Sequence, residues 1–273
     1  MDDLADMRFA CSPLLETATS LWALRRADQY APHLPWVRRA RAAPAAADGL
    51  DTALLAEPAV EDTALLAEPA VEDTGWIPDF ITPRPASPLP DVRDELRRVR
   101  ETPPEKALSD VRTAYAGRAL PPRLAELAPA PRALRDAVAE AVEGYWEVAV
   151  APHWPRMRAV LEADMVHRAR LLAQQGAAAL LTSLDPTAVW RDGELTLFVH
   201  RDLHLGAAVR GRGFWLVPTP FATHAVSPVG PDEPPTIACP AAGWCCTRER
   251  GWATRRRPRR RDHRRGPRAR SAG

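Results

Sequence analysis

The chain has 273 residues, enough for one large domain or two small ones, and 46% of them are hydrophobic, which excludes a globally disordered protein. Twelve arginines against two acids give residues 248–270 a charge of +10. Subtracting this from the net charge of +2 leaves −8 for the rest, so the body is a poor binder of nucleic-acid phosphates.

Neither secretion nor membrane insertion is indicated. The N-terminus, MDDLADMRF, is acidic and lacks a signal-peptide pattern, and the longest apolar run, 176–184, is too short to cross a bilayer. Four cysteines, three of them close together near the C-terminus, do not form the framework of a secreted disulfide-rich domain. We therefore expect a cytoplasmic protein without membrane contact.

Helix signals dominate the first two thirds of the chain. Ser12 is a good N-cap and Pro13 a good first helical residue, so the first helix begins there. DTALLAEPAVE occurs twice without change, at 51–61 and 62–72, which we interpret as a tandem duplication in a tolerant surface segment. Apolar spacing and proline breaks predict further helices. Their ranges are 35–42, 91–101, 104–116, 121–127, 132–150, 155–175 and 177–184.

The pattern changes after the last helix. A tight proline elbow joins 132–150 to 155–175, so we expect these two helices to pack against each other. Segments 188–191 and 194–199 flank Asp192-Gly193, a strong hairpin signal. Further strand candidates are 213–218 and 235–238.

These elements predict an α+β fold, because helices come first and strands follow. We expect a mostly helical body with a small antiparallel β-sheet in its C-terminal part, covering residues 1–238. A disordered Arg-rich tail, 239–273, is expected to follow it.

Aromatic residues near the elbow and the strands allow two interpretations, an ordinary core or a ligand pocket. The candidate pocket residues are Tyr145, Trp146, His153, Trp154, His167, Trp190 and Trp215. Asp164 and His167 share a helical face and could present two metal ligands, but no matching pair follows on a partner helix. We favour a polar cluster with the histidine held by a carboxylate, and predict no metal and no cofactor.

Catalytic motifs are not found. His200, Asp202 and His204 alternate after a strand, a weak pattern more typical of an exposed loop. There is no GxSxG motif, no phosphate-binding Gly-rich loop and no dinucleotide fingerprint. We predict no catalytic residue and expect the chain not to be an enzyme.

The tail allows three interpretations. Cys239, Cys245, Cys246 and His263 could bind zinc, although no CxxC pair is present. Arginines could contact nucleic acid non-specifically. The candidates are Arg255, Arg256, Arg257, Arg259, Arg260 and Arg261. A frameshift near Ala238 fits the composition better, because shifted G/C-rich codons yield mainly Arg, Pro, Gly, Ala, Cys and Trp, the residues that make up the tail.

Six segments of the body occur together in a familiar order. They are FACSPLLETATSLWALR (9–25), HLPWVRRAR (33–41), GWIPDFITPRP (75–85), YWEVAVAPHWPRMRAVLEADMVHRARLLAQQGAAALLTSL (145–184), WRDGELTLF (190–198) and GFWLVPTPF (213–221). Over residues 4–238 the chain resembles the N-terminal domain of unknown function of actinobacterial ArsR-like winged helix-turn-helix transcriptional regulators.

The resemblance implies a regulatory body that senses a small-molecule effector, forms a homodimer, or does both. In that family a C-terminal winged helix binds DNA, which needs an amphipathic recognition helix. No such segment follows Ala238. We therefore expect a regulator truncated before its winged helix, with specific DNA binding doubtful. The alternative is a stand-alone small-molecule binding module with an aromatic-lined pocket.

Overall fold

The computed structural model describes residues 7–25, 27, 30, 33–42, 77–115, 119–185, 188–191, 194–200, 203–205, 213–222, 225 and 236–241. Its helices are α1 (Pro13–Arg25), α2 (Leu34–Ala42), α4 (Val92–Glu101), α5 (Pro104–Ala114), α6 (Pro122–Leu127), α7 (Pro131–Tyr145) and α8 (Trp154–Ser183). The strands are β1 (Met7–Phe9), β2 (Val189–Arg191), β3 (Glu194–His200), β4 (Leu203–Leu205), β5 (Phe214–Thr219) and β6 (Thr236–Pro240).

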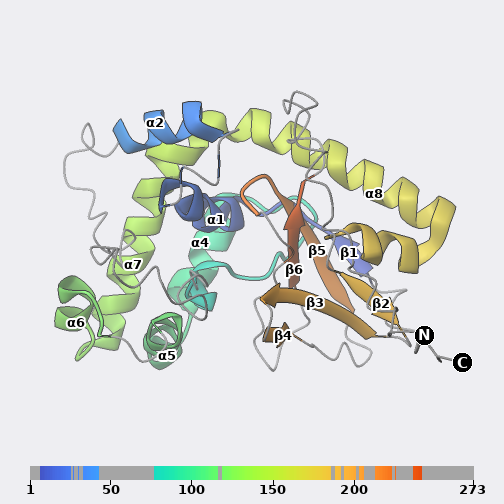
Figure 1. The fold of residues 1–273 in the computed structure, drawn as a ribbon. Coiled ribbons are helices and arrows are strands. Elements are labelled where there is room, and N and C mark those ends of the chain that lie inside the picture. The colour runs from blue at the N-terminus through green and yellow to red at the C-terminus, as the bar shows by residue number, and fades with distance from the viewer. Residues whose placement is uncertain are drawn as a thin grey trace, which may run out of the picture.

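The predicted α+β class is confirmed, with a mostly helical body and an antiparallel sheet in its C-terminal part (Figure 1). Helix starts follow the predicted local signals. Ser12 Oγ accepts a hydrogen bond from Leu15 N at 3.0 Å, and Asp91 Oδ1 accepts one from Arg93 N at 2.8 Å. The duplicated segment 51–72 lies outside the described residues. Among the described residues, no helix has the length and apolarity needed to cross a bilayer.

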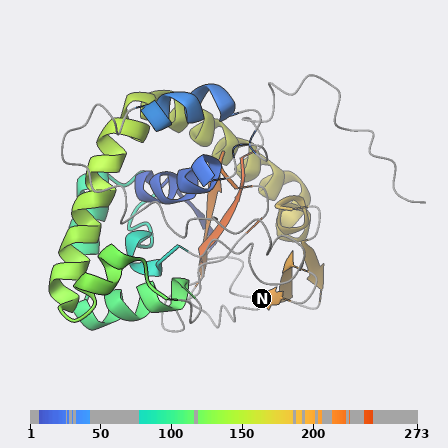
Figure 2. The same ribbon diagram turned by 60° about the vertical axis from the view of Figure 1, so that its left-hand side comes forward.

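Helix α1 lies in the middle of the helical part, inside an arch formed by α2, α7 and α8 (Figure 2). It contacts α2, α4, α7 and β5, so neighbours surround it on several sides. As a result its polar residues are buried together with its apolar ones. The polar residues of α1 and its cap that are buried are Ser12, Glu16, Thr17, Thr19 and Ser20.

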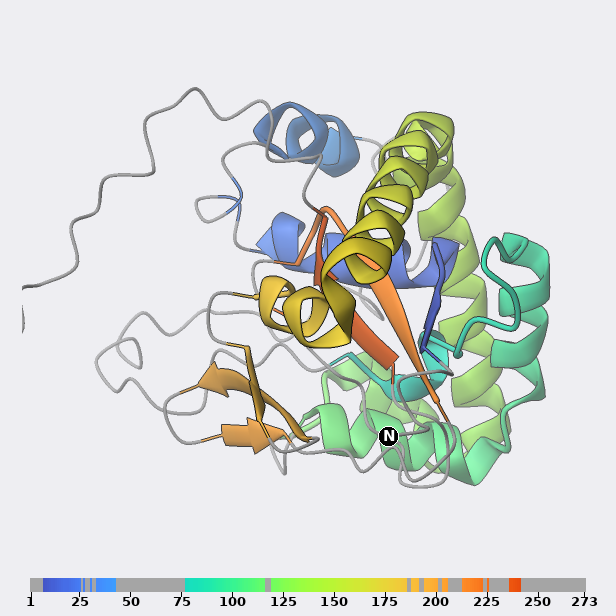
Figure 3. The same ribbon diagram turned by 90° about the vertical axis from the view of Figure 1, so that its right-hand side faces the viewer.

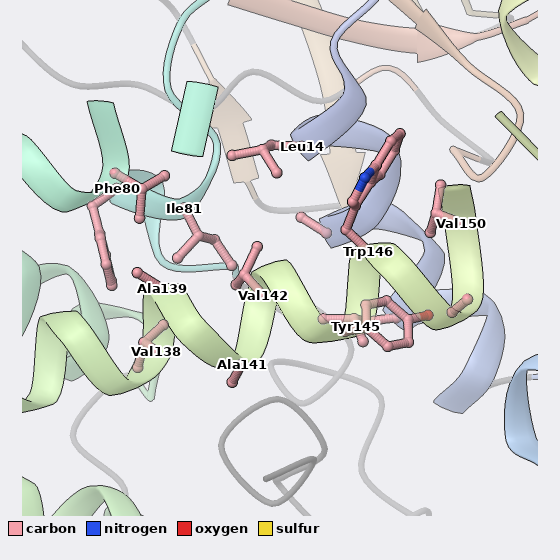
Figure 4. Packing of buried hydrophobic residues seen from close by; sticks show 14 of the residues in the cluster. Leu14, Phe80, Ile81, Val138, Ala139, Ala141, Val142, Tyr145, Trp146 and Val150 are labelled. Atoms are coloured by element: carbon pink, nitrogen blue, oxygen red, sulfur yellow. The ribbon is translucent and has the colours of Figure 1, made fainter. Parts of the chain in front are cut away.

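The hydrophobic core lies between α7 and the helices next to it (Figure 4). Figure 4 shows Leu14 of α1, Phe80 and Ile81 of the short turn Asp79–Ile81, and the buried face of α7. That buried face repeats at helical spacing, as the sequence predicted. It consists of Leu134, Val138, Ala139, Ala141, Val142 and Tyr145.

The elbow between α7 and α8 remains helical throughout. A π-helical turn, Trp146–Val150, and a 3-10 turn, Ala151–His153, connect the two helices. The expectation that they pack along each other is wrong, because these turns redirect the chain: α7 packs on α4 and α5, whereas α8 packs on β2 and β5 (Figure 1). The break predicted between 155–175 and 177–184 is confirmed at Gly176, whose φ is +83°.

Two three-stranded sheets are present among the described residues. The predicted hairpin is confirmed as β2 and β3, which are antiparallel, and β4 continues this sheet. The candidates 213–218 and 235–238 are also strands, but they form a separate parallel sheet in the order β1-β5-β6. The short strand β1 was not predicted, and it lies parallel to β5, which comes from the C-terminal part of the chain (Figure 3).

The folded body extends beyond the predicted boundary at Ala238. Strand β6 continues to Pro240, and Cys239 and Ala241 are both buried. The boundary was therefore placed three residues too early, because parallel pairing with β5 holds a segment that has no helical periodicity. Residues 242–273 lie outside the described residues.

Candidate functional site

The carboxyl ends of the parallel strands meet at the beginning of α1. Ala10 N donates to the Leu216 carbonyl of β5 at 3.1 Å, and the chain then passes through Cys11 into α1. Thr219, which ends β5, is fully buried there. In sheets of parallel strands, ligand sites form outside the carboxyl ends of the strands. We define the strand-end cluster as Ser12, Glu16, Thr19, Glu95 and Thr219.

Glu16 places a carboxyl group inside this cluster with no exposure to solvent. Its Oε2 lies 3.1 Å from the hydroxyl oxygen of Thr219, Oγ1. The same Thr219 oxygen lies 3.2 Å from Thr19 Oγ1 and accepts a hydrogen bond from Phe221 N at 3.1 Å. Thr19 Oγ1 in turn donates to the Leu15 carbonyl at 2.7 Å. Burial raises the pKa of Glu16 well above its ordinary value, and the bond with Thr219 opposes this only in part. Glu16 therefore favours its neutral form.

Glu95 reaches the same region from α4 and caps α1. Its Oε2 accepts a hydrogen bond from Leu14 N at 2.8 Å, next to the Leu15 N donor that Ser12 caps. Burial raises the pKa of Glu95 to about 7, while the bonds from Leu14 and Ser12 and the charge of Arg98 oppose the rise. Glu95 thus changes its charge close to neutral pH.

One oxygen of each acid has no hydrogen-bond partner. In the described part of the chain, these are Oε1 of Glu16 and Oε1 of Glu95, both buried. Such an atom costs about 1–3 kcal/mol of stability. Unfavourable groups that a fold retains are often found at functional sites. Both oxygens could accept a hydrogen bond from a bound ligand or a water molecule.

Polar contacts continue from the strand-end cluster along α1. Ser20 Oγ donates to the Thr17 carbonyl at 2.7 Å and lies 2.9 Å from Tyr145 Oη of α7. His33 Nε2 lies 2.9 Å from the Pro220 carbonyl, which can only accept, so this nitrogen carries the proton. Burial lowers the pKa of His33 to about 4, although that bond opposes the change, and the ring is neutral at pH 7.

A buried ion pair fastens the end of β6 to α8. Arg168 Nε lies 2.6 Å from Asp164 Oδ2, and Arg168 Nη2 donates to the Pro240 carbonyl at 2.7 Å. The two side chains are 5% and 0% exposed, so removing either partner would leave a buried charge. On the other side, Ala241 N donates to the Thr219 carbonyl at 3.0 Å. The end of β6 is therefore held by α8 at Pro240 and by β5 at Ala241.

The two thiols near this ion pair are poor nucleophiles. Burial raises the pKa of Cys11 and of Cys239 to about 12 in each case, so both are protonated at neutral pH. Cys11 Sγ lies 3.1 Å from Met165 Sδ. Within the described ranges, no group of three or more His, Cys, Asp or Glu side chains could hold a metal ion. The chemistry that the site offers is hydrogen bonding and proton uptake by carboxyl groups.

The residues predicted to line an aromatic pocket are only partly brought together. Tyr145, Trp146, His153 and Trp154 lie at the elbow, where the ring centroids of Trp146 and Trp154 are 5.6 Å apart with an interplanar angle of 67°. Figure 4 shows the side chains of Tyr145 and Trp146 pointing in different directions from the end of α7. Burial and the charge of Arg39 lower the pKa of His153. Tyr145, Trp146 and Trp154 belong to the core around α7.

The other three candidates lie elsewhere. His167 is exposed on α8, and Trp190 of β2 packs beneath the C-terminal part of α8. Trp215 of β5 belongs to another cluster, with the Arg8 guanidinium 5.7 Å from its ring centroid. Their positions in separate clusters do not support one pocket lined by all seven residues, because α7 and α8 diverge at the elbow instead of packing together.

The other sequence candidates have different outcomes. Asp164 is buried and binds Arg168, one turn further along α8, while the neighbouring His167 is exposed. His200 and His204 lie on β3 and β4, where their strand partners are Leu203 and Phe198. The remaining members of these patterns lie outside the described residues. They are Asp202, Cys245, Cys246, His263, Arg255, Arg256, Arg257, Arg259, Arg260 and Arg261.

The sequence did not identify Glu16, Glu95 or Thr219. Glu16 and Glu95 each occupy an early position of a helix, where acids are common for electrostatic reasons, so neither stands out. The available signal was the spread of polar residues around α1, which lacks the one-sided apolar stripe of a surface helix. Such a helix is either poorly packed or buried on every side.

No family model, curated protein or solved structure matches the chain. What the strand-end cluster can do is therefore inferred from its own side chains.

Proposed function

We propose that this chain is the regulatory body of an ArsR-like transcriptional regulator, which responds to a small-molecule effector or dimerises. Its resemblance to the N-terminal domain of those regulators supports the family, and the strand-end cluster supports the sensing role. The observation that carries the proposal is the pair of buried acids, Glu16 and Glu95, each with one unpartnered oxygen at the carboxyl ends of parallel strands.

An effector that fits this cluster donates hydrogen bonds, because both spare atoms are carboxyl oxygens. A neutral amide or hydroxyl group could bind either protonation state, and an amine would favour the ionised acids. Nucleophilic catalysis is a weaker candidate, since the buried thiols Cys11 and Cys239 both have a pKa of about 12. We also propose that the chain acts in the cytoplasm.

Thermal-shift screening of the purified full chain tests the sensing role. A compound that binds the folded state at 100 times its dissociation constant adds about 2.7 kcal/mol of stability, which a melting curve detects. We expect Glu16→Leu, which removes the spare oxygen, to reduce the shift caused by a hit, and Glu140→Leu, a change on the exposed face of α7, to leave it unchanged. Hits whose shift is equal in wild type and Glu16→Leu would contradict binding at the strand-end cluster.

A gel-shift titration across salt concentrations tests the DNA side of the proposal. We expect this chain to bind DNA weakly, without sequence preference, and to lose binding as salt rises, because only its last part is strongly basic. Binding to one duplex at physiological salt, with a scrambled duplex as control, would show that the chain itself reads DNA.

A further inference from the structure

Three contacts in the strand-end cluster compete for two hydroxyl protons. The contacts are Thr19 Oγ1 to the Leu15 carbonyl at 2.7 Å, Thr19 Oγ1 to Thr219 Oγ1 at 3.2 Å, and Thr219 Oγ1 to Glu16 Oε2 at 3.1 Å. Each threonine hydroxyl supplies one proton. Phe221 N also donates a hydrogen bond to Thr219 Oγ1, but its proton does not lie in any of the three contacts.

A third proton, on Glu16 Oε2, satisfies all three contacts at once. Glu16 then donates to Thr219, Thr219 donates to Thr19, and Thr19 donates to the Leu15 carbonyl. Thr219 Oγ1 accepts from Glu16 and Phe221 and donates once, which uses its full capacity. If Glu16 is ionised, Thr219 turns its proton toward the carboxylate, and Thr19 can then donate either to Thr219 or to the Leu15 carbonyl. One of the three contacts therefore lacks a proton. The buried geometry thus matches a neutral acid.

Thr219 also connects this chain of hydrogen bonds to the end of β6. Its carbonyl accepts from Ala241 N at 3.0 Å, and β6 runs parallel to β5 up to the pair Thr219 and Pro240. The same residue therefore bonds Glu16 through its side chain and the last described residue, Ala241, through its backbone.

We propose that Glu16 is a proton-dependent latch for β6: the protonated acid completes the hydrogen-bond chain and holds Thr219 in place, and its ionisation breaks the chain and loosens the end of β6. The inference does not depend on the proposed regulatory role. Ionisation would leave a buried negative charge whose Oε1 has no partner, so water must enter between α1 and β5.

Other ionisable groups around α1 do not supply a counter-charge to Glu16. Besides its burial, only the bond with Thr219 has a resolved effect on the pKa of Glu16. Cys11 lies close enough to respond to Glu16 but stays a neutral thiol below pH 12. The remaining ionisable groups on elements that contact α1 include Glu95 and Arg98 of α4, Tyr145 of α7, Asp79 of the short turn, Glu147 of the elbow, and Arg38 and Arg39 of α2. The Arg168–Asp164 pair holds the other side of β6.

Amide hydrogen exchange at pH 6 and pH 9, expressed as protection factors so that the intrinsic pH effect is removed, tests the latch. Because Glu95 also loses its proton in this range, the comparison is made in the Glu95→Gln background, where we expect protection of residues 236–241 to fall by about tenfold or more as pH rises, and by more than that of α7. When Glu16→Gln is added to this background the fall should disappear, because the new amide donates to Thr219 and cannot ionise. Glu140→Gln, added to the same background, is the matched control and should leave the fall unchanged.

Thr219→Val provides a second variant in case Glu16→Gln does not fold. Without the relay hydroxyl, we expect low protection of residues 236–241 at both pH values. Infrared spectra at neutral pH add a direct readout: the carbonyl band of a protonated carboxyl group should be present in Glu95→Gln and absent when Glu16→Gln is added. Equal pH dependence of Glu95→Gln with and without Glu16→Gln, a fall no larger in residues 236–241 than in α7, no fall at all in Glu95→Gln, or no such band would each overturn the latch.

Discussion

The pKa of Glu95 predicts a loss of stability as pH rises through neutrality. Burial raises the pKa of Glu95 from 4.5 to about 7 in the folded protein. Between these values the folded state binds more protons than the unfolded state, so stability is fully present below pH 4.5 and is lost as pH rises through 7. Each pKa unit is worth about 1.4 kcal/mol, which makes the total roughly 3 kcal/mol. Between pH 5 and pH 8 the loss attributable to Glu95 is about 2.5 kcal/mol.

Glu95→Gln removes this contribution while keeping an oxygen that can accept from Leu14 N. Urea unfolding at pH 5 and pH 8 gives the change in unfolding free energy for each protein. We expect the loss between the two pH values to be about 2.5 kcal/mol smaller in Glu95→Gln than in wild type. The contribution of Glu16 is common to both proteins and cancels in this comparison.

Glu101→Gln is the matched control, because Glu101 lies on the same helix with its side chain 60% exposed. Its effect should stay within about 0.5 kcal/mol at either pH. Equal losses in wild type and Glu95→Gln would refute the reasoning, since Glu95 would then titrate alike in the folded and unfolded states.

Three further predictions concern the packing around the site, and urea unfolding at pH 7 measures each. Asp164→Asn leaves Arg168 as an uncompensated buried cation and should lower the free energy of unfolding by about 3–5 kcal/mol. The double variant Asp164→Asn with Arg168→Met should recover part of this loss. A loss below about 1 kcal/mol in Asp164→Asn would contradict the role of the ion pair. Leu134→Ala should cost about 2–5 kcal/mol because Leu134 is fully buried, and Ala133→Gly on the exposed face is the control at about 1 kcal/mol. Tyr145→Phe removes the contact with Ser20 Oγ and should cost about 1 kcal/mol; no change would mean that Ser20 finds its full bonding elsewhere.

Local chemistry in the sequence was sufficient for most of the helices. Ser12 and Asp91 cap α1 and α4 as their residue types predict, because a side-chain oxygen and the nearby backbone donors lie within one turn. Gly176 likewise breaks α8 where the pattern predicted, since only glycine adopts its positive φ without strain. These effects depend on neighbours a few residues away.

Local sequence signals could not predict which strands pair when they lie far apart in the chain. β1 has only three residues, too few for a recognisable strand pattern, and its hydrogen-bond partners lie in β5, about 200 residues later. For the same reason Cys239 and Ala241 join the core although the composition around them changes.

The candidate site depends on the tertiary structure most of all. In the sequence, Glu16 and Glu95 are indistinguishable from the acids that are common in the first turn of a helix. Their burial, which raises the pKa of both, arises only when α4, α7 and β5 enclose α1. The predicted aromatic pocket depended on α7 and α8 packing together, a geometry that the residues of the elbow do not specify alone. Sequence patterns thus determined which segments are helical and where they start, while the burial of charge, and with it the chemistry of the site, came from which elements meet in space.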